Sequence, residues 1–305
     1  MTRIALLGDI HVTQSKNKEF EANRFLELCS TISAKEYDYV IFTGDLFDRA
    51  RPSLEEISLV RKGLSMITTT KIVLDGNHEA VTKDSSTYDY IDIHELQYMP
   101  FNKLKIEGVE LFLLGYKHIN NYITVPKCDI LLSHFRSNFG IIKEEVNVQA
   151  IASKAYLYTI LGDIHQFYSP MDSVHYTSSP YGIHFSKEQY KQGYIELIID
   201  GTIVTKNEIV LNLPTKIILD MTPEEIAHNI LKLDTRHLYR IRVKGTSEEL
   251  ENLPTIPNIQ FITQLTLLEE ESKVEINVDI LEALITLVGD TKDVRNVLTK
   301  IYKEL

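Results

Sequence analysis

Five short apolar segments, each followed at once by a polar loop, constrain the fold of this chain more than any other feature. The segments are rich in β-branched residues, as is typical of buried strands. We therefore expect each loop at the carboxyl end of a strand, where open α/β sheets place the groups that handle ligands. The segments at residues 4–7, 39–43, 72–74, 130–132 and 160–161 lead into Gly8-Asp9-Ile10-His11, Gly44-Asp45, Gly76-Asn77-His78-Glu79, Ser133-His134 and Gly162-Asp163-Ile164-His165.

The side chains in these loops are oxygen donors and imidazoles, a mixture that suits manganese, iron, zinc or magnesium better than a thiolate-seeking metal. Asp9 and His11 lie two residues apart, so both can turn toward one ion. Asp45 could bridge two ions through its carboxylate oxygens, and Asn77 can offer a neutral carbonyl oxygen. A single Asp-x-His pair is more often a surface loop or a capping group. Five strand-end loops in order favour a metal site.

The order of these motifs resembles that of the calcineurin-like metallophosphoesterases, whose pattern runs D-x-H, G-D, G-N-H, a later His and G-H-x-H. Gly44-Asp45-Leu46-Phe47-Asp48, followed by Arg51-Pro52-Ser53, is most similar to the SbcD-type DNA repair nuclease subunits. Tyr176-Thr177-Ser178-Ser179-Pro180 resembles their Tyr-x-Gly-Ser-Pro segment, with Ser178 in place of glycine. The resemblance covers residues 1 to 200, and beyond them it is architectural only.

The resemblance implies two divalent ions, Mn²⁺ or alternatively Mg²⁺, that share Asp45. One ion would be held by Asp9, His11, Asp45 and His165, and the other by Asp45, Asn77, His134 and Asp163. His78 follows a ligand without being one in the family pattern, so it is the expected catalytic residue, free to orient the phosphate or protonate the leaving oxygen.

Two positions depart from the family pattern. Asp163 replaces the first histidine of G-H-x-H, and its charge should shift preference toward harder ions such as manganese or magnesium. Asp48 stands where some members have a histidine that supports exonuclease action, and it could instead cap the turn before Arg51.

The resemblance therefore implies a two-metal DNA nuclease subunit, exonuclease or endonuclease, acting with an SMC-like SbcC-type ATPase in DNA end processing, repair and recombination. A stand-alone phosphatase or nucleotide phosphodiesterase would use the same core and is the alternative. A third reading is a scaffolding protein whose second metal site has decayed at Asp163. The net charge of −11 argues against coating nucleic acid by electrostatics alone but does not exclude a nuclease.

The length of 305 residues favours two units. The expected architecture is α/β: a metallophosphoesterase β-sandwich flanked by helices over residues 1–212, then a small α/β capping domain over 213–266. A linker and C-terminal helices follow over 267–305. Helical spacing predicts helices at 17–34 and 54–67, and Glu107-Gly108 and Asp200-Gly201 predict hairpin turns. In the capping domain, strands are expected at 216–219, 237–243 and 259–263, with helices at 223 onward and 247–253.

The apolar stripes of residues 277–305 fit either packing on the capping domain or, as the family implies, docking on the ATPase. The family also implies a homodimer formed through residues 53–67 and 80–100. Cys29 and Cys128 are expected to be buried and unpaired. No stretch is long enough for a membrane span and no signal peptide is recognisable, so we expect a cytoplasmic protein, in a bacterial cell or, if phage-encoded, in its host.

Overall fold

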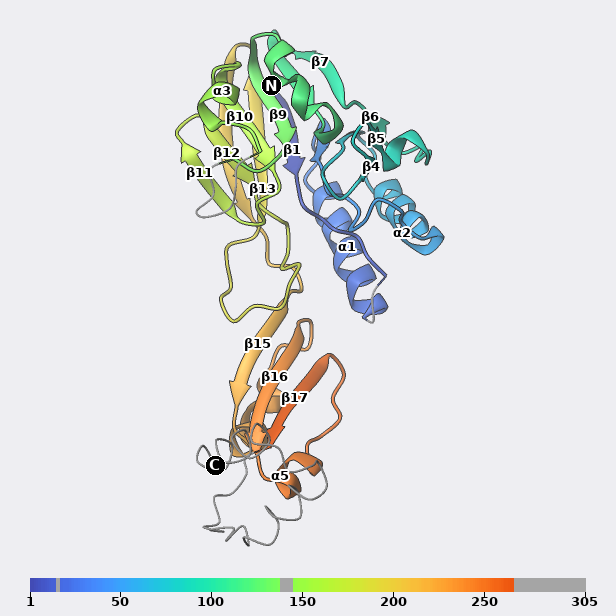
Figure 1. Cartoon of the computed structure of the whole chain (residues 1–305), viewed down its shortest axis with the longest axis vertical. Helices are drawn as coiled ribbons and strands as arrows, with labels where there is room; N and C mark the ends of the chain where they lie inside the picture. The colour runs from blue at the N-terminus through green and yellow to red at the C-terminus, as the bar shows by residue number, and fades with distance from the viewer. Residues whose placement is uncertain (15–16, 138–144, 266–305) are drawn as a thin grey trace, which may run out of the picture.

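The computed structural model describes residues 1–14, 17–137 and 145–265, which form two lobes (Figure 1). The larger lobe contains two six-stranded sheets and the smaller one a three-stranded sheet. The helices predicted within residues 277–305 lie outside the described residues.

The first sheet has the order β14-β13-β1-β2-β3-β6. Strand β1 is parallel to β2, and β2 is parallel to β3, so their carboxyl ends share one edge. On its other side β1 pairs antiparallel with β13, which forms a hairpin with β14. The bounds are β1 Thr2–Leu7, β2 Tyr39–Thr43, β3 Thr70–Leu74, β6 Gln97–Tyr98, β13 Gly193–Asp200 and β14 Ile203–Val210.

The second sheet has the order β11-β12-β10-β9-β8-β7. Strands β8, β9, β10 and β12 are parallel to their neighbours, and β7 and β11 close the edges antiparallel. The bounds are β7 Phe101–Ile106, β8 Val109–Leu114, β9 Cys128–His134, β10 Ala155–Gly162, β11 Phe167–Met171 and β12 Val174–Thr177. A small hairpin of β4 (Ala80–Thr82) and β5 (Ser85–Ser86) and the 3₁₀ helix η1 (Thr87–Asp89) follow β3.

The two sheets face each other across an aliphatic core. Alternate residues of β1 such as Ile4 and Leu6 pack there against Leu113 and Ile130 of the second sheet. The other face of the first sheet packs on α1 (Lys18–Ser33) and α2 (Leu54–Ser65), which begins at a capping box made by Ser53 and Glu56. The outer face of the second sheet is covered by α3 (Val148–Ala152) and η2 (Tyr116–Thr124). A β-sandwich flanked by helices is therefore confirmed.

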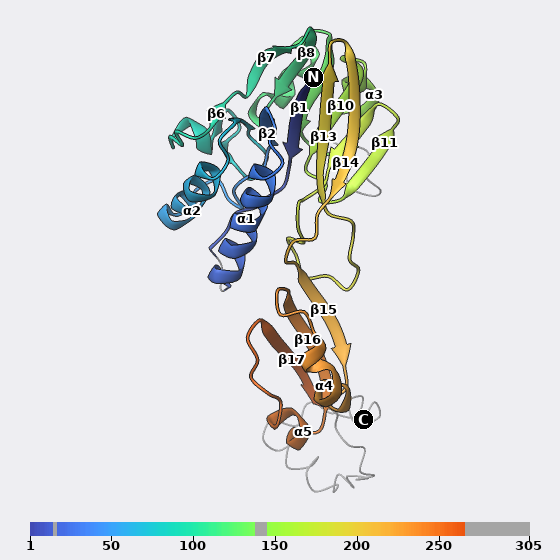
Figure 2. The ribbon, with the colours of Figure 1, turned by 180° about the vertical axis from the view of Figure 1, so that it is seen from behind.

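The smaller lobe is a parallel sheet of β15 (Lys216–Met221), β16 (Leu238–Gly245) and β17 (Ile259–Leu265), seen from behind in Figure 2. Helix α4 (Pro223–Asn229), with Thr222 as its N-cap, is followed by η3 (Ile230–Lys232), and α5 (Ser247–Glu251) connects β16 to β17. This sheet has its own apolar cluster around Ile241. Lys216 contacts Glu21 of α1 at 2.7 Å, which ties the two lobes together.

The predicted helices and hairpins of the described chain are present, and Cys29 and Cys128 are buried and free. Helix α3 and strands β11 and β12 were not predicted. Helix α3 has only five residues, and such short segments carry too little periodicity to stand out in a sequence.

Candidate metal centre

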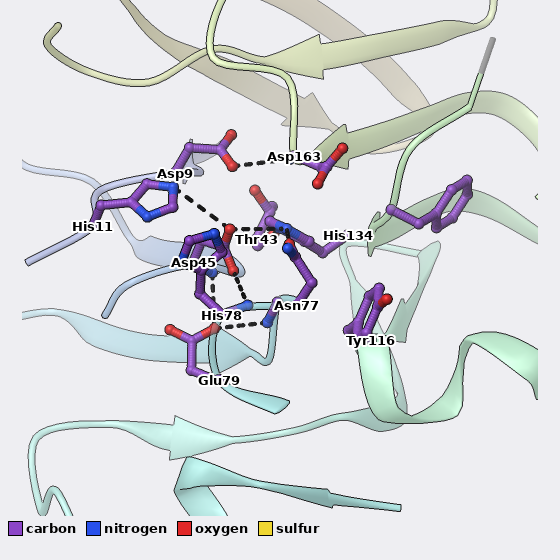
Figure 3. A network of polar contacts seen from close by, with 12 residues as sticks. Asp9, His11, Thr43, Asp45, Asn77, His78, Glu79, Tyr116, His134 and Asp163 are labelled. Atoms are coloured by element: carbon purple, nitrogen blue, oxygen red, sulfur yellow. Dashed lines mark hydrogen bonds and ion pairs between the residues drawn. The ribbon is translucent and has the colours of Figure 1, made fainter. Parts of the chain in front are cut away.

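The carboxyl ends of strands from both sheets meet at one place and bring carboxylates and imidazoles together (Figure 3). Three overlapping triads have ligand atoms within 4.8 Å of one another. We call their members the donor cluster. They are Asp9, His11 and His165; His11, Asp45 and His78; and Asp9, Asp45 and His134. Asn77 lies beside them, with its Oδ1 3.0 Å from His134 Nε2.

Two glycines allow the two sheets to approach this closely. A Cβ on Gly44, which has a φ of +98°, would lie 2.3 Å from the ring of His134. A Cβ on Gly162 would lie 2.4 Å from the same ring. The glycines that end β10 and follow β2 therefore make room for an imidazole between the sheets.

Several residues at the centre have a left-handed backbone, which costs a residue with a Cβ roughly 1–2 kcal/mol. The φ angles are +54° at Asp9, +50° at His11, +52° at Asp45 and +93° at Asp163. Such strain persists only where the surroundings hold it, and it collects at functional sites.

Asp45 lies between two imidazoles. Its Oδ2 is 3.5 Å from His11 Nε2 and 3.4 Å from His134 Nε2, while its Oδ1 accepts a hydrogen bond from the His78 backbone. His134 Nδ1 lies 2.8 Å from the carbonyl oxygen of Thr43, to which it can only donate. The Nε2 of a neutral His134 would then turn a lone pair toward two oxygens, an arrangement that a cation would satisfy.

Asp9 also carries unsatisfied polar atoms. Its Oδ1 accepts a hydrogen bond from the backbone of Asp163 at 2.9 Å. Its Oδ2 and the Nε2 of His11 are buried and have no hydrogen-bond partner among the described residues. Buried polar atoms of this kind are costly unless a ligand completes them.

The pKa values reflect this crowding of charge. Burial opposes the ionisation of Asp45, but the charges of His134 and His11 outweigh it and lower the pKa of Asp45. Burial, opposed by the charge of His134, raises the pKa of Asp9 to about 7. Burial and the charge of His11 lower the pKa of His165 to about 3. The carboxylates and imidazoles of the centre therefore lie close enough together to shift one another's pKa values.

His78 and Asp48 are neighbours at the open side of the centre. His78 Nδ1 lies 2.8 Å from the Asp48 carbonyl oxygen, so it donates there and leaves Nε2 as the free nitrogen. The His78 side chain is 38% exposed. The Asp48 carboxylate contacts His11 Nδ1 at 3.2 Å. Asp48 thus touches both histidines, which its place in the sequence did not indicate.

Glu79 is a further residue whose part the sequence did not reveal. Its buried carboxylate accepts hydrogen bonds from the backbone of Asp45, Phe47 and Gly76 at 2.8–3.0 Å. It therefore joins the loops that follow β2 and β3. Burial, together with the charge of Asp45, raises the pKa of Glu79 to about 7.

His184 was also missed. Its ring centroid lies 6.0 Å from that of His165, although the two residues belong to separate loops. No motif in the sequence marks this histidine.

Asp163 lies beside the donor cluster but is absent from its triads. Its carboxylate makes two contacts with Arg136, at 2.9 and 3.1 Å, and Figure 3 shows it directed away from Asp9. The structure thus brings together the other predicted ligands and engages Asp163 elsewhere. The ligand role of Asp163 stays a prediction, as do the roles of the cluster residues.

Comparison with known proteins agrees with this geometry. Residues 2–150 match the family model of the calcineurin-like phosphoesterases. This part of the chain is thus similar to the calcineurin-like phosphoesterases, and the donor cluster is a candidate site for divalent metal ions.

One relative is the probable exonuclease subunit 1 of Escherichia phage T5, 26% identical over 209 residues. The match covers 62% of this chain and 63% of the relative, so it spans less than two thirds of that protein. A solved archaeal phosphodiesterase is similar at 18% identity and a TM-score of 0.37, over 69% of this chain and all of the other. No helix among the described residues is long and apolar enough to cross a membrane.

Proposed function

We propose that this chain is the nuclease subunit of a DNA-processing complex and hydrolyses phosphodiester bonds with two divalent ions. The observation that carries the proposal is the position of Asp45 Oδ2 between His11 and His134, at 3.5 and 3.4 Å, because a shared carboxylate suits a two-metal centre. The name of the phage relative, an exonuclease subunit, supports DNA as the substrate.

The donor atoms fit the proposed ions. Oxygen and imidazole donors without thiolates favour Mn²⁺, with Mg²⁺ as the alternative. The buried atoms Asp9 Oδ2 and His11 Nε2, which lack partners among the described residues, are the ones that a cation would complete. We assign one ion to Asp9, His11, Asp45 and His165. We assign the other to Asp45, Asn77 and His134, whereas the carboxylate of Asp163 pairs with Arg136.

The bound ions would supply Lewis-acid activation of water and would neutralise charge on the phosphate. Side chains of the protein would supply proton transfer, orientation of the phosphate and positioning of the ligands. His78 donates from Nδ1 to the Asp48 carbonyl, so in its protonated form it can give the Nε2 proton to the leaving oxygen or use this N–H to orient the phosphate. Asp48 holds the ring of His11, and Glu79 fixes the loops that carry Asp45 and Asn77.

The assembly is part of the same proposal. Residues 1–212 would form the nuclease domain, 213–266 a capping domain that helps to position DNA, and 267–305 a segment that docks on an SMC-like SbcC-type ATPase. Two copies would pair through residues 53–67 and 80–100. Such a complex would act on DNA ends in repair and recombination in the cytoplasm.

The test is hydrolysis of end-labelled duplex DNA, bis-p-nitrophenyl phosphate and p-nitrophenyl phosphate, each with Mn²⁺, Mg²⁺ or EDTA. We expect hydrolysis of DNA and the diester with Mn²⁺, and none with EDTA. Asp45→Asn should abolish this activity, whereas Asp200→Asn, which changes a carboxylate that is 73% exposed, should keep it. Hydrolysis of the monoester alone would favour a stand-alone phosphatase and contradict the nuclease proposal.

A further inference from the structure

Arg136 and Asp163 form an ion pair at the edge of the donor cluster. Arg136 follows β9 two residues after His134, and Asp163 follows β10 two residues before His165. Arg136 Nε lies 2.9 Å from Asp163 Oδ2, and Nη2 lies 3.1 Å from Oδ1. This bidentate geometry is the strongest pairing that a guanidinium makes with a carboxylate. It engages both oxygens that a metal ion would need.

The carboxylate of Asp163 is firmly held in this position. Its side chain is only 5% exposed, and its backbone N–H donates to Asp9 Oδ1 at 2.9 Å. The backbone φ of +93° aims the side chain toward β9 and its loop. So unfavourable a backbone conformation persists only where contacts hold the residue in place. The main contact of Asp163 is with Arg136.

Arg136 is fixed at its backbone as well. Its N–H donates to Glu145 Oε2 at 2.9 Å, and the hydroxyl of Tyr116 donates to the other Glu145 oxygen at 3.0 Å. The Arg136 side chain remains 34% exposed. Its third guanidinium nitrogen, Nη1, has no hydrogen-bond partner in the part of the chain that the structure describes. A held cation with one open donor suits an anionic oxygen.

A guanidinium held at this place can serve the substrate through its open N–H donor as well as through its charge. Asp163 offsets part of the charge of Arg136, and Nη1 is the donor that the pair offers to an oxygen. A phosphodiester that approaches this place gains from every fixed positive charge nearby. Arg136 is tied to the cluster through Asp163 and Asp9, so its guanidinium is a pre-positioned charge at the rim.

We infer that Arg136 binds a phosphate oxygen of the substrate, and that Asp163 is the residue that positions Arg136 instead of a ligand of the second ion. The inference rests on the proposed phosphodiesterase function. It replaces the ligand role expected for Asp163 and leaves Asp45, Asn77 and His134 as the protein ligands of that ion. At the position where the family pattern has a histidine ligand, Asp163 would then hold Arg136 in place instead of binding a metal ion.

The test measures binding of inorganic phosphate to the Mn²⁺-loaded full-length protein by calorimetry, together with the Mn²⁺ stoichiometry. We expect Arg136→Gln to raise the Kd of phosphate roughly ten- to hundredfold, as for loss of a charged hydrogen bond. The Kd of phosphate for Arg136→Lys should lie between those of the wild type and of Arg136→Gln, because lysine keeps the charge but cannot make the bidentate contact. Arg3→Gln, at an arginine that is likewise 34% exposed and paired with a carboxylate, Glu196, should have no effect.

Asp163→Asn separates the positioning role from ligation. We expect it to weaken phosphate binding, to keep the wild-type Mn²⁺ stoichiometry, and to raise KM for the diester more than it lowers kcat. The double variant R136Q/D163N should bind phosphate no more weakly than Arg136→Gln alone, since Asp163 acts through Arg136. Thermal unfolding of each variant shows that it is folded.

Loss of one Mn²⁺ per chain in Asp163→Asn would overturn the inference and make Asp163 a ligand. Unchanged phosphate affinity in Arg136→Gln would overturn it as well. Failure of the wild type to cleave DNA would refute only the nuclease function, because inorganic phosphate and Mn²⁺ are the probes for Arg136 and Asp163.

Discussion

Single residues in this protein adopt backbone conformations that their side chains disfavour, and these residues are concentrated around the donor cluster. Ser178 is the most informative case outside the cluster. It has a φ of +67° and is buried in the loop after β12. The nucleases that this segment resembles carry glycine at this place, and the φ angle gives the reason, since glycine alone adopts a left-handed backbone without cost.

We predict that Ser178→Gly is more stable than Ser178→Ala by about 1 kcal/mol, the reverse of the usual order of these residues in helices. Both changes remove the hydroxyl group, which contacts the backbone oxygens of His165 and Ser179 at 3.4 and 3.1 Å. The pair therefore isolates the effect of Cβ. Urea unfolding measures the difference, and a more stable alanine variant would show that no strain is present.

His78 is the residue on which the chemistry should depend most. We predict that His78→Ala lowers DNA hydrolysis by roughly 10²- to 10⁴-fold, the usual contribution of a positioned acid or base. Both metal ions should remain, because His78 is not among the assigned ligands. The geometry alone would also allow ligation, since His78 shares a triad with His11 and Asp45. Loss of metal on elemental analysis would therefore assign His78 to the ions, and His118→Ala, at a half-buried histidine of η2, is the control.

At the scale of elements, the donor residues could be predicted because each follows a strand. Asp9 and Asp45 come two residues after the ends of β1 and β2, so the apolar runs placed them at one edge of a sheet. The partner of Asp163 could not be predicted in this way. The pair Arg136–Asp163 depends on β9 and β10 being neighbours, and the turn of the Asp163 side chain depends on its φ angle.

The pairing of neighbouring strands also creates a pH-sensitive position in β12. His175 is buried there, with Nδ1 2.7 Å from Ser169 Oγ and its ring beside Tyr158. Burial and the nearby Lys206 lower the pKa of His175 to about 4. In the unfolded chain the pKa returns to about 6.5. Between these values the unfolded chain binds more protons, so the free energy of unfolding falls as the pH drops from 6.5 to 4.

We predict that His175→Asn, which keeps a partner for Ser169, removes this part of the acid sensitivity. The difference in unfolding free energy between wild type and variant should shift in favour of the variant by up to about 3 kcal/mol from pH 7 to pH 4. Denaturant titrations at a series of pH values measure it. A constant difference across the range would mean that His175 keeps its ordinary pKa in the folded protein.

At the scale of the whole molecule, the sandwich and the parallel strand-helix unit at 216–265 could be predicted, because both consist of regular alternations of apolar pattern and turn. The contacts that join the two lobes could not be predicted from the sequence. The contacts of Lys216 with Glu21, and of Gln260 with Asn17, connect segments far apart in the sequence. His184 and Glu79 escaped notice for the same reason, since their importance lies in neighbours that the chain order does not reveal.

Deletion of residues 277–305 is the test of the proposed assembly. We predict that the truncated chain keeps Mn²⁺-dependent hydrolysis of single-stranded DNA and loses co-purification with the ATPase. The apolar stripes of this segment predict two short helices, which would bury too little surface to be stable unaided, so we expect them to dock on a partner. If the truncated chain instead loses cooperative melting, the segment packs on its own protein and the proposal of a partner-docking segment is wrong.

The place of β1 within the first sheet has a consequence for the order of events during synthesis. β1 emerges from the ribosome long before β13, at residues 193–200, which is one of its two neighbours in the sheet. Until then the nascent chain must keep an apolar strand with one free edge, a form that invites mispairing. The two triads that contain Asp9 likewise cannot form until His134 and His165 have been synthesised. Loading of the two proposed ions would therefore be a late step that follows the packing of the two sheets. A chain arrested before residue 165 would lack His165, one of the ligands that we propose for the first ion.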